Sequence, residues 1–415
     1  MNRFLQIHTL TSYPATLLNR DDAGFAKRLP FGGAVRTRVS SQCLKKHWRD
    51  FKGEGALSGL DVPMSVRSRF TFDELVVKPL MKEGVRVELA RAVTQALMDE
   101  VLGKSAKAKE ADKKEAEERA TSKKGKAEPA KETEAEPLQT GQITVLGWPE
   151  VEFLLGEARK ICAKKPDLTE VGKVVSDALG RDGKENLKTL KHAAGLDAAL
   201  FGRMVTSDIL ARGDAAIHVA HAFTVHGEAS ESDYFSAVDD LLALRDDEMG
   251  SGHIGSSELT SGLFYGYVVL DVPLLLSNLE GVKREDAAKA NHDLAAQVAE
   301  RLVKLVATVS PGAKLGSTAP HSYAHLVFVE SGNAQPRTLA NAFLRPVAEC
   351  PDLLDNSYVA LAAHVRDIDR MYGPSGMRRL AAMGPTKALP DALRVEKLES
   401  LADVATWAAG QVRSQ

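Results

Sequence analysis

The sequence contains little cysteine: only Cys43, Cys162 and Cys350 occur among 415 residues, none of them in a CxxC pair. An odd number of scattered cysteines argues against a disulfide framework and against a zinc ribbon or finger. A reducing cytoplasm is therefore the expected compartment. No apolar run approaches the roughly 20 residues of a membrane-spanning helix, so we expect no membrane association. The N-terminus, MNRFLQIHTL, lacks the three regions of a signal peptide.

Catalytic and metal-binding motifs are also lacking. The sequence has no GxxxxGK[ST], no GxSxG and no HExxH. His218 and His221 would point to opposite faces of a predicted strand, which argues against a shared metal, although His221 could lie near a ligand. The adjacent Asp21 and Asp22 could hold a divalent metal, but such pairs more often cap turns. We expect no cofactor, no metal and no enzymatic activity.

The charge of the chain is distributed unevenly. Hydrophobic residues make up 44% and charged residues 27% of the sequence, which is enough apolar material for a sizeable core. The formal net charge is only −2, yet residues 1–70 carry +7 and the remainder −9. A basic segment on an otherwise acidic chain is typical of a surface that binds a polyanion, and a solvated basic face is the alternative.

Hydrophobic periodicity predicts strands and helices that alternate irregularly along the chain. The predicted strands are residues 4–11, 35–40, 217–225, 263–270 and 324–329. The predicted helices are residues 42–51, 291–309, 356–370 and a final helix through Trp407, with a helical pattern also over 148–211. The fold class is therefore α+β, with strands distant in sequence joined in one sheet and helices packed on it.

Two segments differ from this pattern. Residues 104–137 contain ten basic and nine acidic residues and almost no large apolar side chain, which predicts a disordered insertion. The near balance of charge argues against a nucleic-acid-binding tail. The segment 371–380, MYGPSGMRRL, is predicted to be a basic loop whose role the sequence does not reveal.

The N-terminal region combines backbone freedom with positive charge. Gly32 and Gly33 would let the backbone approach a ligand closely. Arg36 and Arg38 are expected on the outer face of a short strand. A phosphate chain is a natural ligand for this combination, and a tight turn with ordinary surface arginines is the alternative.

The helix that follows extends the same predicted surface. Ser40 and Ser41 supply an N-cap, and the helix N-terminus would offer free N–H groups to an anion. Lys45 and Arg49 are four residues apart and would share one face.

Ten short blocks together resemble one known family. They are IHTL, LNRDD, FGG, RTRVSSQCLK, GRMVTSD, AIHVAHAFTVH, DYFSAVDDL, GSGHIGSSELTSGLFYGY, PGAK and ANAF. In this order they resemble the family of CasC, the repeated backbone subunit that binds CRISPR RNA (crRNA) in type I-E Cascade. The insertion at 104–137 and the segment 371–380 match this family poorly.

The resemblance implies a right-hand architecture with a modified RRM-like (ferredoxin-like) palm. Residues 1–70 would begin the palm, 71–203 would form a helical finger region, 204–261 a thumb, and 262–415 the remaining palm and C-terminal helices. Family subunits stack as a helical filament, commonly hexameric, along the guide crRNA. The guide then pairs with target DNA, and other Cascade subunits complete the assembly.

The resemblance also implies residue roles. Arg20, Lys45 and Arg49 would face the RNA backbone, with Gln42 and Lys46 as further candidates. Met204 and Phe235 are read as core or loop anchors from the sequence alone, but they match apolar residues that pack around a flipped nucleotide. The complete predicted RNA site comprises Arg20, Gly32, Gly33, Arg36, Arg38, Ser40, Gln42, Lys45, Lys46, Arg49, Met204 and Phe235.

Two alternatives remain from the sequence. Related backbone subunits of type III complexes cut target RNA with a loop aspartate, for which Asp21 or Asp22 would be the candidate. The other alternative is an RRM-like module that binds cellular RNA as a monomer, with some sequence preference.

Overall fold

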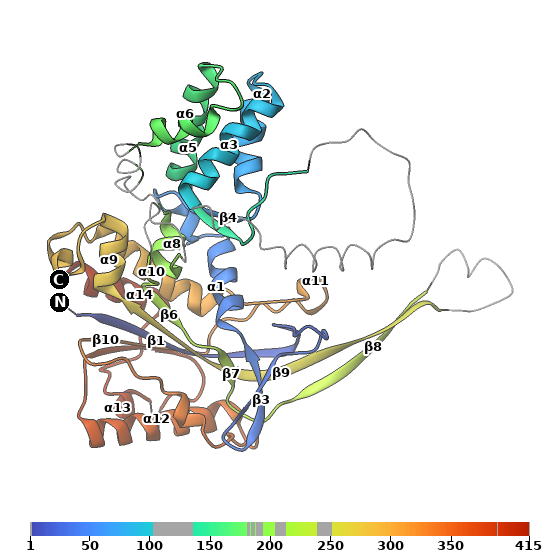
Figure 1. Cartoon of the computed structure of the whole chain (residues 1–415). Helices are drawn as coiled ribbons and strands as arrows, with labels where there is room; N and C mark the ends of the chain where they lie inside the picture. Colours follow the sequence, from blue (N-terminus) through green and yellow to red (C-terminus); the bar gives the residue numbers. More distant parts are fainter. Residues whose placement is uncertain are drawn as a thin grey trace. The chain divides into compact units, whose positions relative to one another are not determined.

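The computed structural model describes residues 2–102, 136–180, 183, 187, 194–203, 213–238, 251–387 and 389–414. The chain divides into two compact units (Figure 1). Unit 1 comprises residues 1–60, 217–273 and 291–415, and unit 2 comprises residues 61–216 and 274–290. Most of the insertion predicted at 104–137 lies outside the described residues, as does Met204.

Unit 1 is built on a nine-stranded sheet flanked by helices. Its strands are β1 (Phe4–Thr16), β2 (Arg28–Phe31), β3 (Ala34–Val39), β6 (Ile217–Val219), β7 (Ala222–Thr224), β8 (Ser230–Val238), β9 (Ser251–Asp271), β10 (Leu326–Gly332) and β11 (Met377–Ala382). Its helices are α1 (Ser41–Asp50), α10 (Asp293–Thr308), α11 (Leu315–Thr318), α12 (Leu353–Tyr372), α13 (Leu389–Leu393) and α14 (Leu401–Arg413), with short 3-10 turns η1 (Leu57–Gly59) and η5 (Ala340–Phe343).

The order β11-β10-β1-β9-β7-β3-β2 places β1 near the middle of the sheet and puts β11 and β2 at its two edges. Strand β1 pairs antiparallel with β10 and with β9, so that Phe4 lies opposite both Gly332 and Asp271. Strands from the two ends of the chain therefore meet, which confirms the predicted sheet of sequence-distant strands. The strand predicted at 217–225 is in fact two strands, β6 and β7, interrupted at Ala220 and His221.

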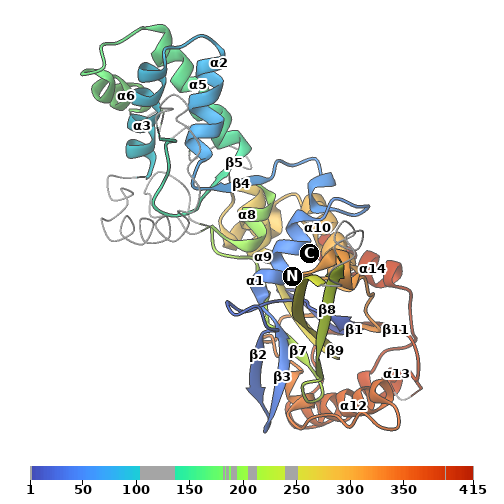
Figure 2. The same cartoon turned by 90° about the vertical axis from the view of Figure 1, so that its right-hand side faces the viewer.

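Alternation along β1 sorts its side chains onto two covered faces. His8 and Leu10 face the side packed by α12 and α13, where Leu10 joins the apolar core around Phe328 and Tyr358. Tyr13 faces the other side, where α1 and α10 lie. Figures 1 and 2 show α1, α10 and α14 on one side of the sheet and α12 and α13 on the opposite side. The two chain ends are also adjacent, because the Asn2 side-chain amide donates to Gln411 at 3.0 Å.

The segment 371–380 is not a loop throughout. Residues Met377–Ala382 form the edge strand β11, which pairs with β10. The prediction of a basic loop there was wrong because Arg378 is buried, with 5% of its surface exposed, between two carboxylates contributed by α12 and β10.

Unit 2 is mainly helical. Its elements are β4 (Ser65–Ser68), the π-helix η2 (Asp73–Val77), α2 (Lys78–Lys82), α3 (Val87–Leu102), β5 (Thr144–Gly147), α5 (Trp148–Ala163), α6 (Val171–Leu179), α8 (Leu196–Phe201) and η4 (Arg284–Lys289), with α9 (Val272–Glu280) entering from unit 1. Helices α3, α5 and α6 share an apolar core (Figure 2). Across the described residues of both units, every helix is too short or too polar to span a bilayer.

Candidate nucleic-acid interface

Arg36 and Arg38 lie on the same face of β3, where Arg36 is buried and Arg38 is half-buried. Arg36 is completely buried, and its guanidinium donates to the carbonyl oxygens of Phe31 (3.3 Å), Thr224 (3.0 Å) and Phe343 (3.0 Å). Burial lowers the pKa of the Arg36 guanidinium. The prediction that Arg36 lies on an outer face was therefore wrong: its donors hold three backbone segments together.

Gly32 and Gly33, at the tip of the β2–β3 hairpin, also differ from each other. A Cβ on Gly32 would stand 1.4 Å from the carbonyl oxygen of Leu344, so Gly32 serves a close contact inside the protein. Gly33 has open space around it and a φ of +82°. Of the two glycines, only Gly33 leaves the protein backbone open to the close approach of a ligand that the sequence predicts.

The N-terminus of α1 has the predicted cap but few free donors. The Ser40 side chain accepts from the Cys43 N–H at 3.3 Å, which confirms Ser40 as the N-cap. The Ser40 N–H donates to Asn19 Oδ1 (2.9 Å), and the Ser41 N–H donates to His221 Nδ1 (3.2 Å). The expectation of free N–H groups was therefore wrong for Ser40, Ser41 and Cys43.

Positive charge gathers around His221, where β6 and β7 are interrupted. Arg38 lies 3.4 Å from the imidazole Nδ1 and also donates from Nε to the Arg28 carbonyl oxygen. Burial lowers the pKa of His221, and the charges of Arg38, Lys27 and Lys45 lower it further. No acidic side chain of the described chain lies within ion-pair distance of Lys27 or Arg38. We call Lys27, Arg38, Lys45 and His221 the basic cluster.

Further along α1, two predicted RNA contacts share one carboxylate. Lys46 Nζ lies 2.8 Å from Asp50 Oδ2, and Arg49 Nε lies 2.9 Å from Asp50 Oδ1. Burial alone would raise the pKa of Asp50, but these two hydrogen bonds outweigh it and lower the pKa. Gln42 is exposed at the start of the same helix, and its Oε1 accepts from the Ser41 hydroxyl.

Arg20 and its neighbours form the loop after β1. Asp21 Oδ1 accepts from the N–H groups of Ala23 (3.0 Å) and Phe25 (2.9 Å), so this carboxylate closes a tight turn. Arg20, Asp21 and Asp22 line a shallow hollow that Ala313 also borders. Within the described ranges, no group of three or more His, Cys, Asp and Glu side chains is placed to hold a metal ion.

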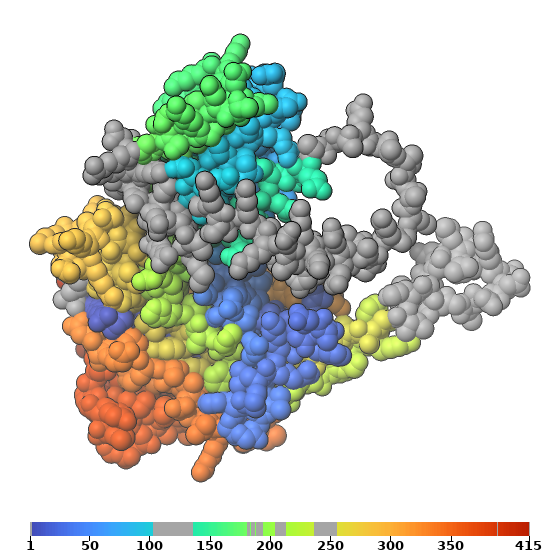
Figure 3. Space-filling model, in the orientation of Figure 1, coloured from blue at the N-terminus to red at the C-terminus, as the bar shows by residue number. Residues whose placement is uncertain are grey.

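Phe235 lies on the long β8–β9 hairpin. It pairs with Gly255 across the hairpin, and its ring covers the position that a Gly255 Cβ would occupy. The ammonium of Lys314 lies 5.5 Å from the ring centroid, and 41% of the Phe235 surface remains exposed. In Figure 3 the blue N-terminal segment and the yellow-green hairpin are neighbours on one face. Met204, the other predicted apolar contact, lies outside the described residues.

Reasoning from the sequence did not identify Lys27 and Lys314 as site residues, and it identified only part of the role of His221. Lys314 ends the PGAK block, whose Ala313 N–H donates to Leu17 O at 2.9 Å and whose Gly312 N–H donates to His47 Nε2 at 3.3 Å. These bonds hold the PGAK segment against β1 and α1. The +7 charge of residues 1–70 included Lys27, but only the fold places it beside His221.

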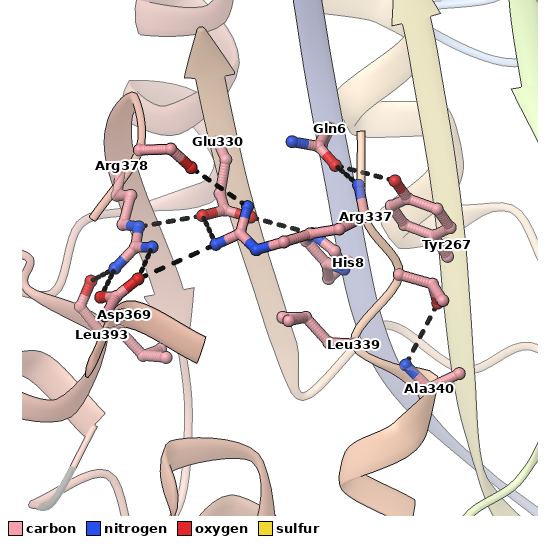
Figure 4. Close-up of polar contacts among 12 residues, drawn as sticks. Gln6, His8, Tyr267, Glu330, Arg337, Leu339, Ala340, Asp369, Arg378 and Leu393 are labelled. Carbon is pink, nitrogen blue, oxygen red and sulfur yellow. Dashed lines mark hydrogen bonds and ion pairs between the residues drawn. The ribbon is translucent and has the colours of Figure 1, made fainter. Parts of the chain in front are cut away.

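A second polar cluster lies on the opposite face of the sheet (Figure 4). Glu330 of β10 accepts from Arg378 (2.9 Å) and Arg337 (3.1 Å), and its other oxygen lies 3.4 Å from His8 Nε2. Burial alone would raise the pKa of Glu330, but His8 and the two arginines lower it to about 2. Burial lowers the pKa of His8. This cluster is packed inside unit 1 and does not belong to the basic surface.

Comparison with known proteins places the chain in a family. A family model described as CT1975-like protein matches residues 5–407. A chain of a solved "CRISPR RNA-guided surveillance complex, pre-nicking" is 23% identical, with a TM-score of 0.74, covering 98% of this chain and 100% of its own. A chain of a second "CRISPR RNA-guided surveillance complex" is 22% identical, with a TM-score of 0.65, covering 98% and 99%. These two likenesses show a shared fold. No curated protein matches the chain.

Proposed function

Because the chain belongs to the family of CT1975-like proteins, which are Cas7-like, we propose that it binds the crRNA of a surveillance complex as a Cascade backbone subunit. The observation that carries this proposal is the basic cluster of Lys27, Arg38 and Lys45 around His221. Phosphate contacts position a protein on a nucleic acid without reading its sequence, which suits a subunit that must accept any guide.

The neighbouring hairpin supplies a second kind of contact. Phe235 offers one exposed aromatic ring beside the Lys314 ammonium. A ring of this kind can stack on any base, because every base has a π-face. Phe235 stacks on a displaced base and the basic cluster binds nearby phosphates, so that together they hold a short segment of the single-stranded guide.

The wider proposal follows the family resemblance. The protein stacks with other copies of itself, as a hexameric filament along the crRNA of a type I-E complex, together with other Cascade subunits. The guide pairs with target DNA, so that base pairing provides the specificity. Unit 1 corresponds to an RRM-like palm with the β8–β9 hairpin as thumb, unit 2 corresponds to the finger region, and the compartment is the cytoplasm.

We propose no catalytic step. Asp21 or Asp22 would be the candidate for RNA cleavage, and the Asp21 carboxylate already accepts two backbone N–H groups in a turn. Incubating the assembled protein with complementary target RNA and Mg²⁺ should leave the RNA intact. Cuts at regular spacing that disappear in Asp22→Ala would establish the cleaving alternative instead.

The direct test of the proposed function is size-exclusion chromatography with light scattering on single-stranded RNAs of increasing length. The mass of the complex should rise in steps with RNA length, for unrelated sequences alike. One protein per RNA at every length, with a sequence preference, would instead identify a stand-alone RRM-like module.

A further inference from the structure

The described part of the β8–β9 hairpin is joined to the rest of the sheet at its base. Strand β1 pairs with β9 as far as Thr16, which lies opposite Thr260. From Thr260 toward the tip, the strand that pairs with the described part of β9 is β8, from Ser230 to Val238. Figure 1 shows the two strands extending together beyond the sheet. Because backbone pairing with the sheet ends at Thr260, side-chain contacts set the direction of the hairpin that carries Phe235.

Glu258 of β9 connects this part of the hairpin to the N-terminal segment of the chain. Its Oε2 accepts from the Ala26 N–H at 2.6 Å, and its Oε1 accepts from the Arg28 guanidinium. Arg28 also donates to Glu228, which precedes β8. Only 9% of the Glu258 side chain is exposed, so both of its oxygens bind groups inside the protein.

The two groups that Glu258 binds belong to the residues on either side of Lys27. The Lys27 N–H donates to the Asn19 carbonyl oxygen at 2.9 Å, and the Lys27 carbonyl oxygen accepts from the Arg38 N–H at 2.8 Å. Side chains alternate in direction along an extended segment, so Lys27 points away from the side of its two neighbours and into the basic cluster around His221. Glu258 therefore holds the segment that presents Lys27.

Phe235 lies on the opposite face of the hairpin from Glu258. It pairs with Gly255, which is three residues from Glu258, and successive side chains of a strand alternate between faces. The Phe235 ring faces the Lys314 ammonium, whereas Glu258 faces the segment that carries Lys27. At about 3.3 Å per residue, the two positions are about 10 Å apart along the hairpin. A movement of the hairpin that breaks the contacts of Glu258 would therefore move Phe235 as well.

The charge of Glu258 is unfavourable for RNA binding. A carboxylate beside the basic cluster weakens the attraction of that cluster for a polyanion. Glu258 does not neutralise the cluster either, because its ion pair is with Arg28 and none joins it to Lys27 in the described chain. What its contacts do is join the segment that would bind phosphate to the hairpin that would stack on a base.

We propose that Glu258 is a positioning residue that couples the two halves of the RNA site. This inference rests on the proposed function and adds to it an energetic link between the phosphate contact of Lys27 and the base contact of Phe235. The Glu258 carboxylate keeps these two side chains at one spacing. When a phosphate of the guide is bound at Lys27, less conformational freedom is lost as the next base stacks on Phe235.

The test is a double-mutant cycle of RNA affinity, measured on the full chain by fluorescence anisotropy with a short labelled RNA that holds one copy. Lys27→Ala, Phe235→Ala and the combined variant measure the coupling when Glu258 is present. The same three variants in a Glu258→Ala background measure it when the carboxylate is gone. Glu231→Ala is the matched control, because Glu231 is an exposed carboxylate of β8 and its removal changes the charge of the hairpin equally.

Thermal unfolding of each variant checks that it folds. If Glu258→Ala does not fold, Glu258→Gln takes its place in every comparison. Its amide oxygen still accepts from the Ala26 N–H, but it cannot form the ion pair with Arg28.

The expected result is a coupling that depends on Glu258. With Glu258 present, the losses in the two single variants should multiply to at least about fivefold more than the loss in the combined variant. In the Glu258→Ala background they should multiply to the combined loss within about twofold. Glu258→Ala alone should weaken RNA binding by about fivefold or more, although it removes a negative charge, whereas Glu231→Ala should bind RNA at least as tightly as the wild type.

Equal coupling in the two backgrounds, or a Glu258→Ala variant that binds RNA as tightly as Glu231→Ala, would overturn the role of Glu258 and leave RNA binding by the protein in place. Failure of the wild type to bind any RNA would instead overturn the proposed function, and the coupling with it.

Discussion

Removing the charges of Lys27 and Arg38 tests the RNA-binding surface most directly. No acidic side chain of the described chain pairs with either one, so a Lys27→Ala, Arg38→Ala variant loses two available positive charges. Each lost phosphate contact reduces the slope of log K against log salt by about 0.7 for single-stranded nucleic acid, so the slope should fall by about 1.4. The corresponding loss of affinity is about 25-fold at 0.1 M salt and about fivefold at 0.3 M.

The assay is fluorescence anisotropy with a short labelled RNA that holds one copy, measured between 0.05 and roughly 0.5 M salt. The matched control is Lys283→Ala with Lys289→Ala, which removes the same charge from unit 2 outside the basic cluster. The control should keep the wild-type slope. An unchanged slope in the Lys27 and Arg38 variant, or an equal fall in the control, would refute the assignment of the RNA backbone to the basic cluster.

Three further predictions concern particular contacts. Gly32→Ala should lower the free energy of unfolding by at least about 2 kcal/mol, because its Cβ would collide with the Leu344 carbonyl oxygen. Gly33→Ala should lower it by only about 1 kcal/mol, because the only cost there is the positive φ. Urea unfolding of the two variants measures this difference. The folded pKa of Glu330, about 2, lies below its usual 4.5, so its contribution to stability is present above about pH 4.5 and is lost as the pH falls toward 2. Between pH 6 and pH 3 the free energy of unfolding of the wild type should therefore fall by about 2 kcal/mol more than that of Glu330→Gln. Equal losses in the two proteins would contradict this. Phe235→Ala should weaken RNA binding by about 1–3 kcal/mol with an unchanged salt slope, and a changed slope in the same anisotropy assay would argue against stacking.

The sequence predicts the elements that are short runs rich in apolar residues or that have a clear helical pattern. Residues 4–11, 263–270 and 324–329 become parts of β1, β9 and β10, and the helices predicted at 42–51 and 291–309 become α1 and α10. A strand covered by helices on both faces favours a run rich in apolar residues, because both of its faces are buried. The polar Gln6 within β1 is accommodated by the hydrogen bond that it accepts from Tyr267. The serine cap of α1 is predictable for a similar reason, since its hydrogen bond is local.

Features that depend on distant partners are not predictable in this way. Arg36 and Arg38 have the same parity and similar neighbours in sequence, yet only Arg36 lies beneath the Phe343 carbonyl, more than 300 residues away. Arg378 seemed part of a basic loop because its partners Asp369 and Glu330 belong to other elements. The basic cluster likewise brings together Lys27 and His221, which precede and follow the long segment 61–216 that belongs to unit 2.

The position of the segment 61–216 in the chain also sets the order in which the two units are synthesised. Strand β1 finds its first long partner only when β9 exists, since Phe4 pairs with Asp271. At a ribosomal rate of about 5–20 residues per second, the 267 residues that follow Phe4 up to and including Asp271 take about 13–50 s to make. The apolar core of unit 2, from Phe72 to Leu187, has by then been completely translated. Unit 2 can therefore fold first, while the apolar strand β1 stays unpaired until β9 has been made. During this period a ribosome-associated chaperone can bind β1.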